Sequence, residues 1–474
     1  MTHQINASPS PANSSGDKPL SLRTKLVFGF GDWGNSSTST IFGFFFAFFL
    51  NNIAGVQPIY AIPVLLAGGI WDAINDPLIG VFADRVRTRW GRRRPFFLFG
   101  AIPFGLSFIL LWWVPPFESQ AALSVYYSLV YILFDTAYTF VAVPYSALTP
   151  ELTGDYNERT SLNGYRMVVS VVAGLVAAVA MPFFVEQVAE KQAAYLAVAA
   201  VFGILAIIPY LLLFFFIKER FQNVESAKFS IFKGFQLTWR NKPFRYAAGI
   251  YTTAWVSVSL AGALFQYYLT FWLRIPTQVD VILGLLMVST LVFIPLIVFL
   301  SKRLGKQKAY IIALGWWAVV MISLFLLPPY FTPVIYFLIA AAGIGVAAAH
   351  VIPASMIPDV IDQDELNTGF HREATYYGFI VLIQKAGSAA LLAFMQLALS
   401  VSGYQIPISP SNPLATLQPE SALWTIRFLI GPVCAALLGG SILLAWKYPI
   451  TRESHTKLRK SIEIQRAEVD QPLD

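Results

Sequence analysis

Two carboxylates and an amide lie close together at residues 71–77, in a stretch of chain that is otherwise apolar. Asp72 and Asp76 are four residues apart, so a helix would place both on one face, and Asn75 would share that side. Neighbouring buried carboxylates repel each other unless a cation lies between them. We therefore predict that Asp72 and Asp76 bind sodium or lithium as metal ligands, or share a proton. The alternative is that each pairs with a basic residue of another helix.

Few basic residues lie inside the apolar stretches, so each one needs an explanation. Lys385 is placed to neutralise the acid pair when no cation is bound, and Arg166 is placed to hold a hydroxyl or carboxylate of a substrate. Arg427 is expected to extend its side chain toward the membrane interface.

Two further acids, Asp32 and Asp135, occur in apolar stretches. Asp32 next to Trp33 suits a polar ligand with an apolar face, such as a sugar, although a polar link between helices fits equally well. Tyr138 adds a hydroxyl or a stacking ring. His350 could carry a proton, but a single histidine in a helix is more often a packing residue.

Two charged segments are candidate gates. Asp84 precedes a run of arginines that includes Arg92, and the acidic segment 358–365, which we expect to be a loop, contains Asp359 and Asp362. Opposite charges on two halves of a protein can hold one conformation closed and release the other. The alternative is two solvated loops.

The composition favours a membrane protein. Of the 474 residues, 56% are apolar and only 12% are charged, whereas about a quarter of the residues of a soluble domain are charged. This excludes a disordered chain, a nucleic-acid-binding module and an ordinary soluble enzyme. The single cysteine, Cys434, excludes an intrachain disulfide.

Twelve stretches are long enough to cross a bilayer as helices. They do not alternate between apolar and polar residues as membrane strands would. They are 26–51, 58–84, 95–114, 121–148, 160–184, 192–217, 244–272, 277–300, 309–327, 333–356, 375–401 and 422–446.

Basic residues decide the expected orientation. They gather after the second, sixth and eighth spans, whereas the loops 52–58, 115–120, 328–332 and 402–421 contain no Lys or Arg. Both termini and the basic loops are therefore expected in the cytoplasm. The predicted organisation is a flexible tail at 1–22, a six-helix bundle at 23–217, a cytoplasmic loop at 218–243, a second six-helix bundle at 244–447 and a cytoplasmic tail at 448–474.

These residues resemble the glycoside–pentoside–hexuronide:cation symporters, a branch of the major facilitator superfamily that includes the melibiose permease. The matching segments are 71–77, 84–85, 89–95, 143–153, 158–160, 165–166, 358–362 and 385–389. The resemblance implies an all-α membrane protein of twelve transmembrane helices in two pseudo-symmetric bundles. It also implies that Asp72, Asp76, Asn75 and Thr139 bind the cation, that Arg166 lies in the sugar site, and that Lys385 lies near the cation.

The sugar site departs from that family pattern. The family's two sugar-binding acids correspond to Ser36 and Ala142, and its stacking tryptophan corresponds to Ser146. Asp32 lies one turn before Ser36 on the same helix face. The predicted substrate-binding residues are therefore Asp32, Trp33, Ser36, Tyr138 and Arg166, and no galactoside specificity is inherited.

We predict a symporter in the cytoplasmic membrane that couples sodium or proton flow to uptake of a glycoside or a related polar solute. One alternative is a carrier of an amphipathic lipid such as a lysophospholipid, which should show an apolar slot between the bundles. The other is a non-transporting receptor. We expect no catalytic residues, no cofactor besides the coupling cation, and no nucleic-acid partner.

Overall fold

The computed structural model describes residues 20–153, 155–219, 238–329, 332–368 and 373–450. Most of both predicted tails and of the predicted central loop 218–243 lies outside these residues. The helices are α1 (Leu22–Phe30), α2 (Asp32–Asn52), α3 (Pro58–Arg85), α4 (Arg94–Leu111), α5 (Gln120–Ser146), α6 (Thr149–Leu152), α7 (Tyr156–Gln187), α8 (Lys191–Phe216), α10 (Lys242–Tyr267), α11 (Val279–Leu304), α12 (Lys306–Leu326), α13 (Thr332–Thr368), α14 (Glu373–Val401), α15 (Glu420–Phe428) and α16 (Cys434–Trp446).

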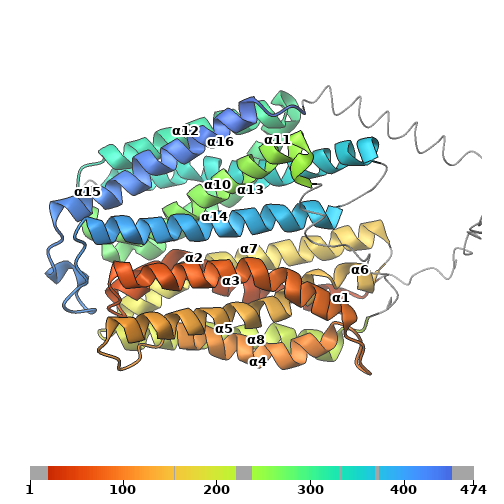
Figure 1. Ribbon diagram of the computed structural model, residues 1–474, viewed down its shortest axis with the longest axis horizontal. Coiled ribbons are helices and arrows are strands. Elements are labelled where there is room, and N and C mark those ends of the chain that lie inside the picture. Colours follow the sequence, from red (N-terminus) through yellow and green to blue (C-terminus); the bar gives the residue numbers. More distant parts are fainter. Residues whose placement is uncertain (1–19, 154, 220–237, 330–331, 369–372, 451–474) are drawn as a thin grey trace, which may run out of the picture.

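The long helices form two groups that lie side by side (Figure 1). In the first group, α2 packs on α7 and α8, α4 packs on α8 and α5, and α5 packs on α3. In the second group, α10 packs on α14 and α16, α12 packs on α16 and α13, and α13 packs on α11. The order of contacts is the same in both groups, as expected of related six-helix units. The groups meet where α3 contacts α14, α7 contacts α11, and α2 contacts α10.

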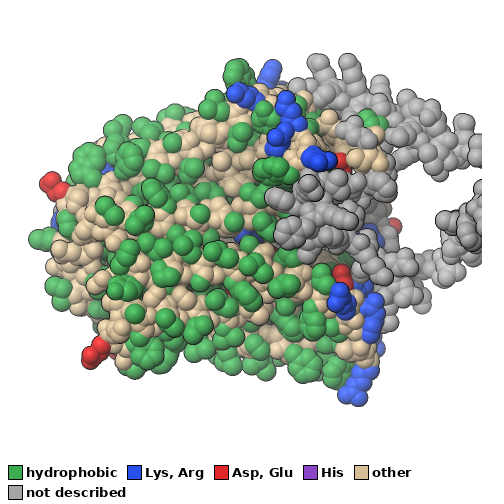
Figure 2. Space-filling model, in the orientation of Figure 1, with side chains coloured by type: hydrophobic (Ala, Val, Ile, Leu, Met, Phe, Trp, Pro, Cys, Tyr) green, Lys and Arg blue, Asp and Glu red, His purple; other side chains and the backbone are tan. Residues whose placement is uncertain are grey.

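Eleven helices of the described chain are long and apolar enough to cross a membrane. The predicted first span, α2, is not among them, because polar residues such as Asn35, Ser36 and Asn51 interrupt it. Its segment 45–52 is instead buried within the protein, so its polar groups meet other helices rather than lipid. Apolar side chains cover the middle of the molecule, and most visible Lys and Arg side chains gather at the end near α6 (Figure 2).

The prediction of a loop at 358–365 is wrong, because α13 continues through these residues to Thr368. A proline inside a helix removes one backbone hydrogen bond, but neighbouring helices can compensate for this in a bundle. Pro358 lies inside α13, and Asp359 is buried beside Lys306 of α12.

Close packing around the first helices depends on glycine. Gly31 joins α1 to α2, and a Cβ atom there would lie 2.6 Å from the Tyr145 ring and 2.9 Å from Leu213. Gly69 of α3 similarly faces Ala389 of α14, where an added Cβ would be 2.2 Å from the alanine Cβ. This contact brings α3 and α14 together beside the acid pair.

Candidate functional site

The acid pair of α3 is joined to the second half of the protein by one lysine. The Nζ atom of Lys385 lies 2.6 Å from Oδ1 of Asp72 and 2.5 Å from Oδ2 of Asp76. The exposed fraction of the side chain is 20% for Asp72, 30% for Asp76 and 21% for Lys385. The lysine ammonium thus occupies the position between the carboxylates where the sequence predicts a cation, and the partial exposure leaves the site accessible.

The other two predicted cation ligands lie at the same site. Thr139 of α5 donates a hydrogen bond to Oδ1 of Asp76 at 3.0 Å. The Nδ2 atom of Asn75 donates to the carboxylate and to the carbonyl oxygen of Asp135, both at 3.2 Å. With Nδ2 engaged by Asp135, the Asn75 carbonyl oxygen remains an acceptor for a cation.

Asp135 belongs to this cluster, although the sequence analysis did not assign it to the site. It lies one turn before Thr139 on α5, so both face α3, and it is 5% exposed. The four-residue spacing between Asp135 and Thr139 is the sequence pattern that could have placed Asp135 at this site. Hard oxygen ligands of this kind suit Na⁺ or Li⁺ rather than a transition metal, which prefers nitrogen and sulfur.

A second polar cluster lies between α2 and α7. The Nε atom of Arg166 donates to Oδ1 of Asp32 at 3.2 Å, and the Ser36 hydroxyl donates to Oδ2 of Asp32 at 3.0 Å. Ser36 also contacts Ser170 at 2.6 Å. Among the described residues, the terminal nitrogens of Arg166 make no hydrogen bond, and its guanidinium lies 4.9 Å from the centre of the Tyr145 ring. Arg166 can therefore hold Asp32 and still bind an anion.

The two aromatic residues predicted to contact the substrate, Trp33 and Tyr138, pack against phenylalanine rings. Trp33 stacks on Phe30 with ring centres 6.0 Å apart. Tyr138 packs against Phe104 and Phe134, at 5.9 Å and 6.1 Å. Their assignment to the substrate site remains a prediction.

The candidate gates form ion pairs within each half. Asp84 contacts Arg92 at 2.5 Å and Arg93 at 2.8 Å, all in the first half. Asp359 pairs with Lys306 at 2.7 Å in the second half, and Asp362 is half-buried on α13. A gating role for these residues remains a prediction.

Arg93 also binds the buried Glu151 of α6, at 2.9 Å. Burial holds the pKa of Glu151 above its usual value, and the Arg93 guanidinium reduces this rise. The ion pair therefore helps to keep this carboxylate charged in the interior.

The end of the molecule opposite the basic loops is sealed by hydrogen bonds between the two halves. The Tyr267 hydroxyl shares its one hydrogen between Oδ1 of Asn51 at 2.5 Å and the Ala47 carbonyl at 2.7 Å, and the Tyr404 hydroxyl donates to Asn52 at 2.6 Å. All four side chains are buried. This seal is not among the predicted features, although two asparagines directly after an apolar run, Asn51 and Asn52, are a pattern that could indicate it.

We expect Tyr267→Phe to loosen this seal, because the substitution leaves a buried asparagine oxygen without its donor. A cysteine introduced at the exposed Ser39 reports the change through its reaction with a membrane-impermeant maleimide added from the side of the loop 53–57. Labelling should rise about tenfold, and the buried Cys434 should contribute little background.

Tyr126→Phe is the matched control, because its hydroxyl bonds to Leu110 within the first half. It should leave labelling unchanged. Equal labelling in the Tyr267 and Tyr126 variants would show that the network at Asn51 does not hold this end closed.

Comparison with known proteins identifies the family. Residues 27–452 match the model of the MFS/sugar transport protein family. The chain is 34% identical to an uncharacterized symporter of Synechocystis, over 94% of this chain and 97% of that protein. It is 31% identical to the sodium-dependent lysophosphatidylcholine symporter 1 of Xenopus tropicalis, over 97% and 94% of the two chains.

The solved structures share the fold. A bacterial homologue of the human lysosomal transporter Spinster superposes with a TM-score of 0.65 and 12% identity, over 92% of this chain and 97% of that one. The expected all-helical major facilitator fold is thus confirmed. The protein belongs to the MFS/sugar transport protein family and is a multi-pass membrane symporter, not an enzyme.

Proposed function

We propose that this symporter is driven by sodium, which binds between Asp72 and Asp76 in exchange for the ammonium group of Lys385. The observation that carries the proposal is the contact of one lysine with both carboxylates. A tethered ammonium has the same charge as Na⁺, so either can offset the repulsion between the two carboxylates, but both cannot occupy the same position. The runner-up coupling ion is a proton shared by the acids.

The exchange connects cation binding to conformation. Asp72 and Asp76 belong to α3 in the first half, and Lys385 belongs to α14 in the second half. When Na⁺ displaces the lysine, an ionic link between the halves is lost. The stability of the present conformation, which is closed at one end, then changes relative to that of the alternative conformation. The binding of solute and the binding of cation then affect each other by the same factor.

Under the orientation expected from the basic loops, the sealed end faces outward and the basic end faces the cytoplasm. The present conformation is then closed to the outside. The membrane we propose is the cytoplasmic membrane.

The favoured solute is a lysophospholipid-like amphiphile. Arg166 has terminal N–H groups available for a phosphate group, and arginine suits phosphate because of its planar donor geometry. The positions of the family's sugar-binding acids hold Ser36 and Ala142 instead. The Xenopus tropicalis relative is named for lysophosphatidylcholine. The polar cluster around Asp32 and the description of the matched family keep a glycoside as the second candidate.

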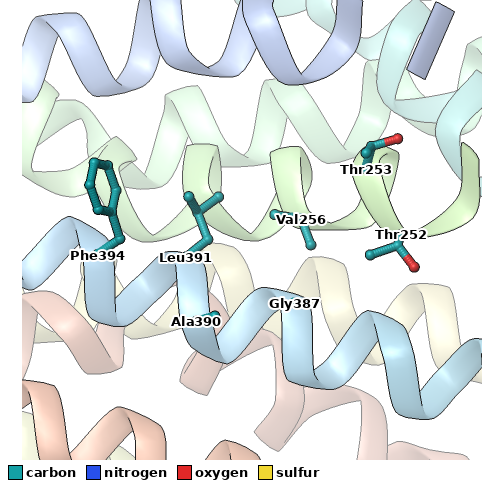
Figure 3. Close-up of a pocket in the computed structure, with 7 residues that line it drawn as sticks. All are labelled: Thr252, Thr253, Val256, Gly387, Ala390, Leu391 and Phe394. Atoms are coloured by element: carbon teal, nitrogen blue, oxygen red, sulfur yellow. The ribbon is translucent and has the colours of Figure 1, made fainter. Parts of the chain in front are cut away.

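An apolar groove of about 350 Å³ lies between α10 and α14 (Figure 3). Val256 of α10 faces Gly387, Leu391 and Phe394 of α14 there. Both helices belong to the second half, so this is not the slot between bundles expected of a lipid carrier. The groove offers an acyl chain an apolar surface, but the choice of a lipid rests on Arg166 and the relatives.

Uptake into proteoliposomes tests the proposal. An inward sodium gradient should raise accumulation of radiolabelled lysophosphatidylcholine about tenfold over a choline gradient, and an excess of glycosides should not compete. Accumulation of a glycoside instead would overturn the lipid assignment. Accumulation driven equally well by a proton gradient without sodium would overturn sodium coupling. The absence of any ion-dependent flux would support a receptor.

A further inference from the structure

We propose that His350 accepts a hydrogen bond from a hydroxyl group of the transported solute, with Trp255 beside it as an aromatic wall. The proposal rests on the function proposed above and identifies a residue that selects the solute. His350 lies on α13 and Trp255 lies on α10, so the contact would come from the second half, opposite Arg166.

The burial pattern of α13 places His350 at an internal opening. Residues 345–349 are buried, His350 is exposed, and Ala354 and Pro358 are exposed at successive turns toward the basic end. Because α10, α11 and α12 all pack on α13, this stripe on an enclosed helix does not indicate lipid contact. The helix α10 also contacts α2 of the first half, so the Trp255 side of α13 faces the region between the halves.

The hydrogen bonds of His350 determine which ring nitrogen is available. Its Nδ1 atom lies 2.8 Å from the carbonyl oxygen of Val346. A carbonyl oxygen can only accept, so Nδ1 carries the hydrogen, and in the neutral ring Nε2 is an acceptor. Among the described residues, Nε2 has no hydrogen-bond partner. An exposed acceptor at a fixed position suits a hydroxyl donor.

Trp255 holds the imidazole in place and adds an apolar surface. The two ring centres are 4.6 Å apart with an angle of 59° between the ring planes. A carbon atom that bears the hydroxyl could pack against the indole while the hydroxyl reaches Nε2.

This chemistry fits a solute with a free hydroxyl on a short carbon backbone. The glycerol of a lysophospholipid carries such a hydroxyl, and a diacyl phospholipid has an ester in its place. A sugar also carries hydroxyls, so the shared chemistry is an alcohol donor. In the lipid case, His350 would distinguish the single-chain lipid from ordinary bilayer lipid.

The test compares lysophosphatidylcholine with its methyl ether, in which the free hydroxyl is blocked, by equilibrium binding to the full chain in nanodiscs. The wild type should bind the free hydroxyl about tenfold more tightly. His350→Phe keeps a ring beside Trp255 but has no acceptor, so it should lose this preference while sodium affinity stays unchanged. His350→Gln retains an acceptor oxygen and should keep part of the preference.

A parallel arm replaces the lipid pair with a glycoside and its deoxy analogues, which distinguishes the two sources of the hydroxyl. An unchanged preference in His350→Phe, or no preference in the wild type for either pair, would overturn the proposal. If His350→Phe does not fold, His350→Gln and His350→Ala provide the same comparison with and without an acceptor. Failure of the sodium-driven uptake described above, with the binding preference intact, would reject the proposed coupling and leave the His350 contact standing.

Discussion

Asp72→Asn should abolish accumulation of solute against its gradient while solute exchange across the membrane continues. The amide has nearly the shape of the carboxylate but no charge, so the site no longer needs a cation, and Lys385 pairs with Asp76 alone. Sodium-driven uptake into proteoliposomes should fall by about tenfold or more. Exchange of unlabelled for labelled solute, measured in the same vesicles without a sodium gradient, should persist.

Glu118→Gln provides the matched control, because Glu118 is an exposed carboxylate in the loop between α4 and α5. It should accumulate solute like the wild type. Asp76→Asn should behave like Asp72→Asn, because both acids contact the same ammonium group. Full accumulation in either acid variant would remove the acid pair from the coupling mechanism.

Lys385→Met should bind sodium more tightly than the wild type and should accumulate solute more slowly. In the wild type, sodium must displace an ammonium group that lies 2.6 Å and 2.5 Å from the two carboxylates. Without that competing ammonium group, sodium is the cation that offsets the repulsion between the two carboxylates. The sodium concentration that gives half-maximal thermal stabilisation should fall about tenfold or more, and net transport should slow because the ion is released less readily.

Lys191→Met tests whether the loss of any partly buried lysine gives the same result. Lys191 pairs with Glu186 at 3.2 Å within the first half, far along the chain from the acid pair. Its sodium dependence should match that of the wild type. A weaker sodium response in Lys385→Met than in the wild type would mean that the lysine helps to hold the ion and does not compete with it.

The acid pair could be found from sequence because helical spacing and the cost of buried charge are both local properties. Lys385 could be named as the neutralising partner because so few basic residues lie within the spans. Its simultaneous contact with both acids depends on the approach of Gly69 to Ala389, which no local pattern reveals. The place of Asp135 at the site likewise depends on which face of α5 meets α3.

Features that join distant segments were harder to predict. The seal brings Tyr267 to Asn51 and Tyr404 to Asn52, and hydrophobic patterning does not specify such pairs. The segment 358–365 is acidic and begins with a proline, a composition typical of a loop. It is helical because Asp359 finds Lys306 on a neighbouring helix, which removes much of the cost of burying its charge.

Calorimetric titration of sodium into the purified protein tests most directly whether sodium binds at Asp72 and Asp76. We expect saturable sodium binding in the wild type and its loss in the double variant Asp72→Asn/Asp76→Asn. Sodium binding of equal affinity in both proteins, or no sodium binding to the wild type, would contradict the exchange of a sodium ion for Lys385.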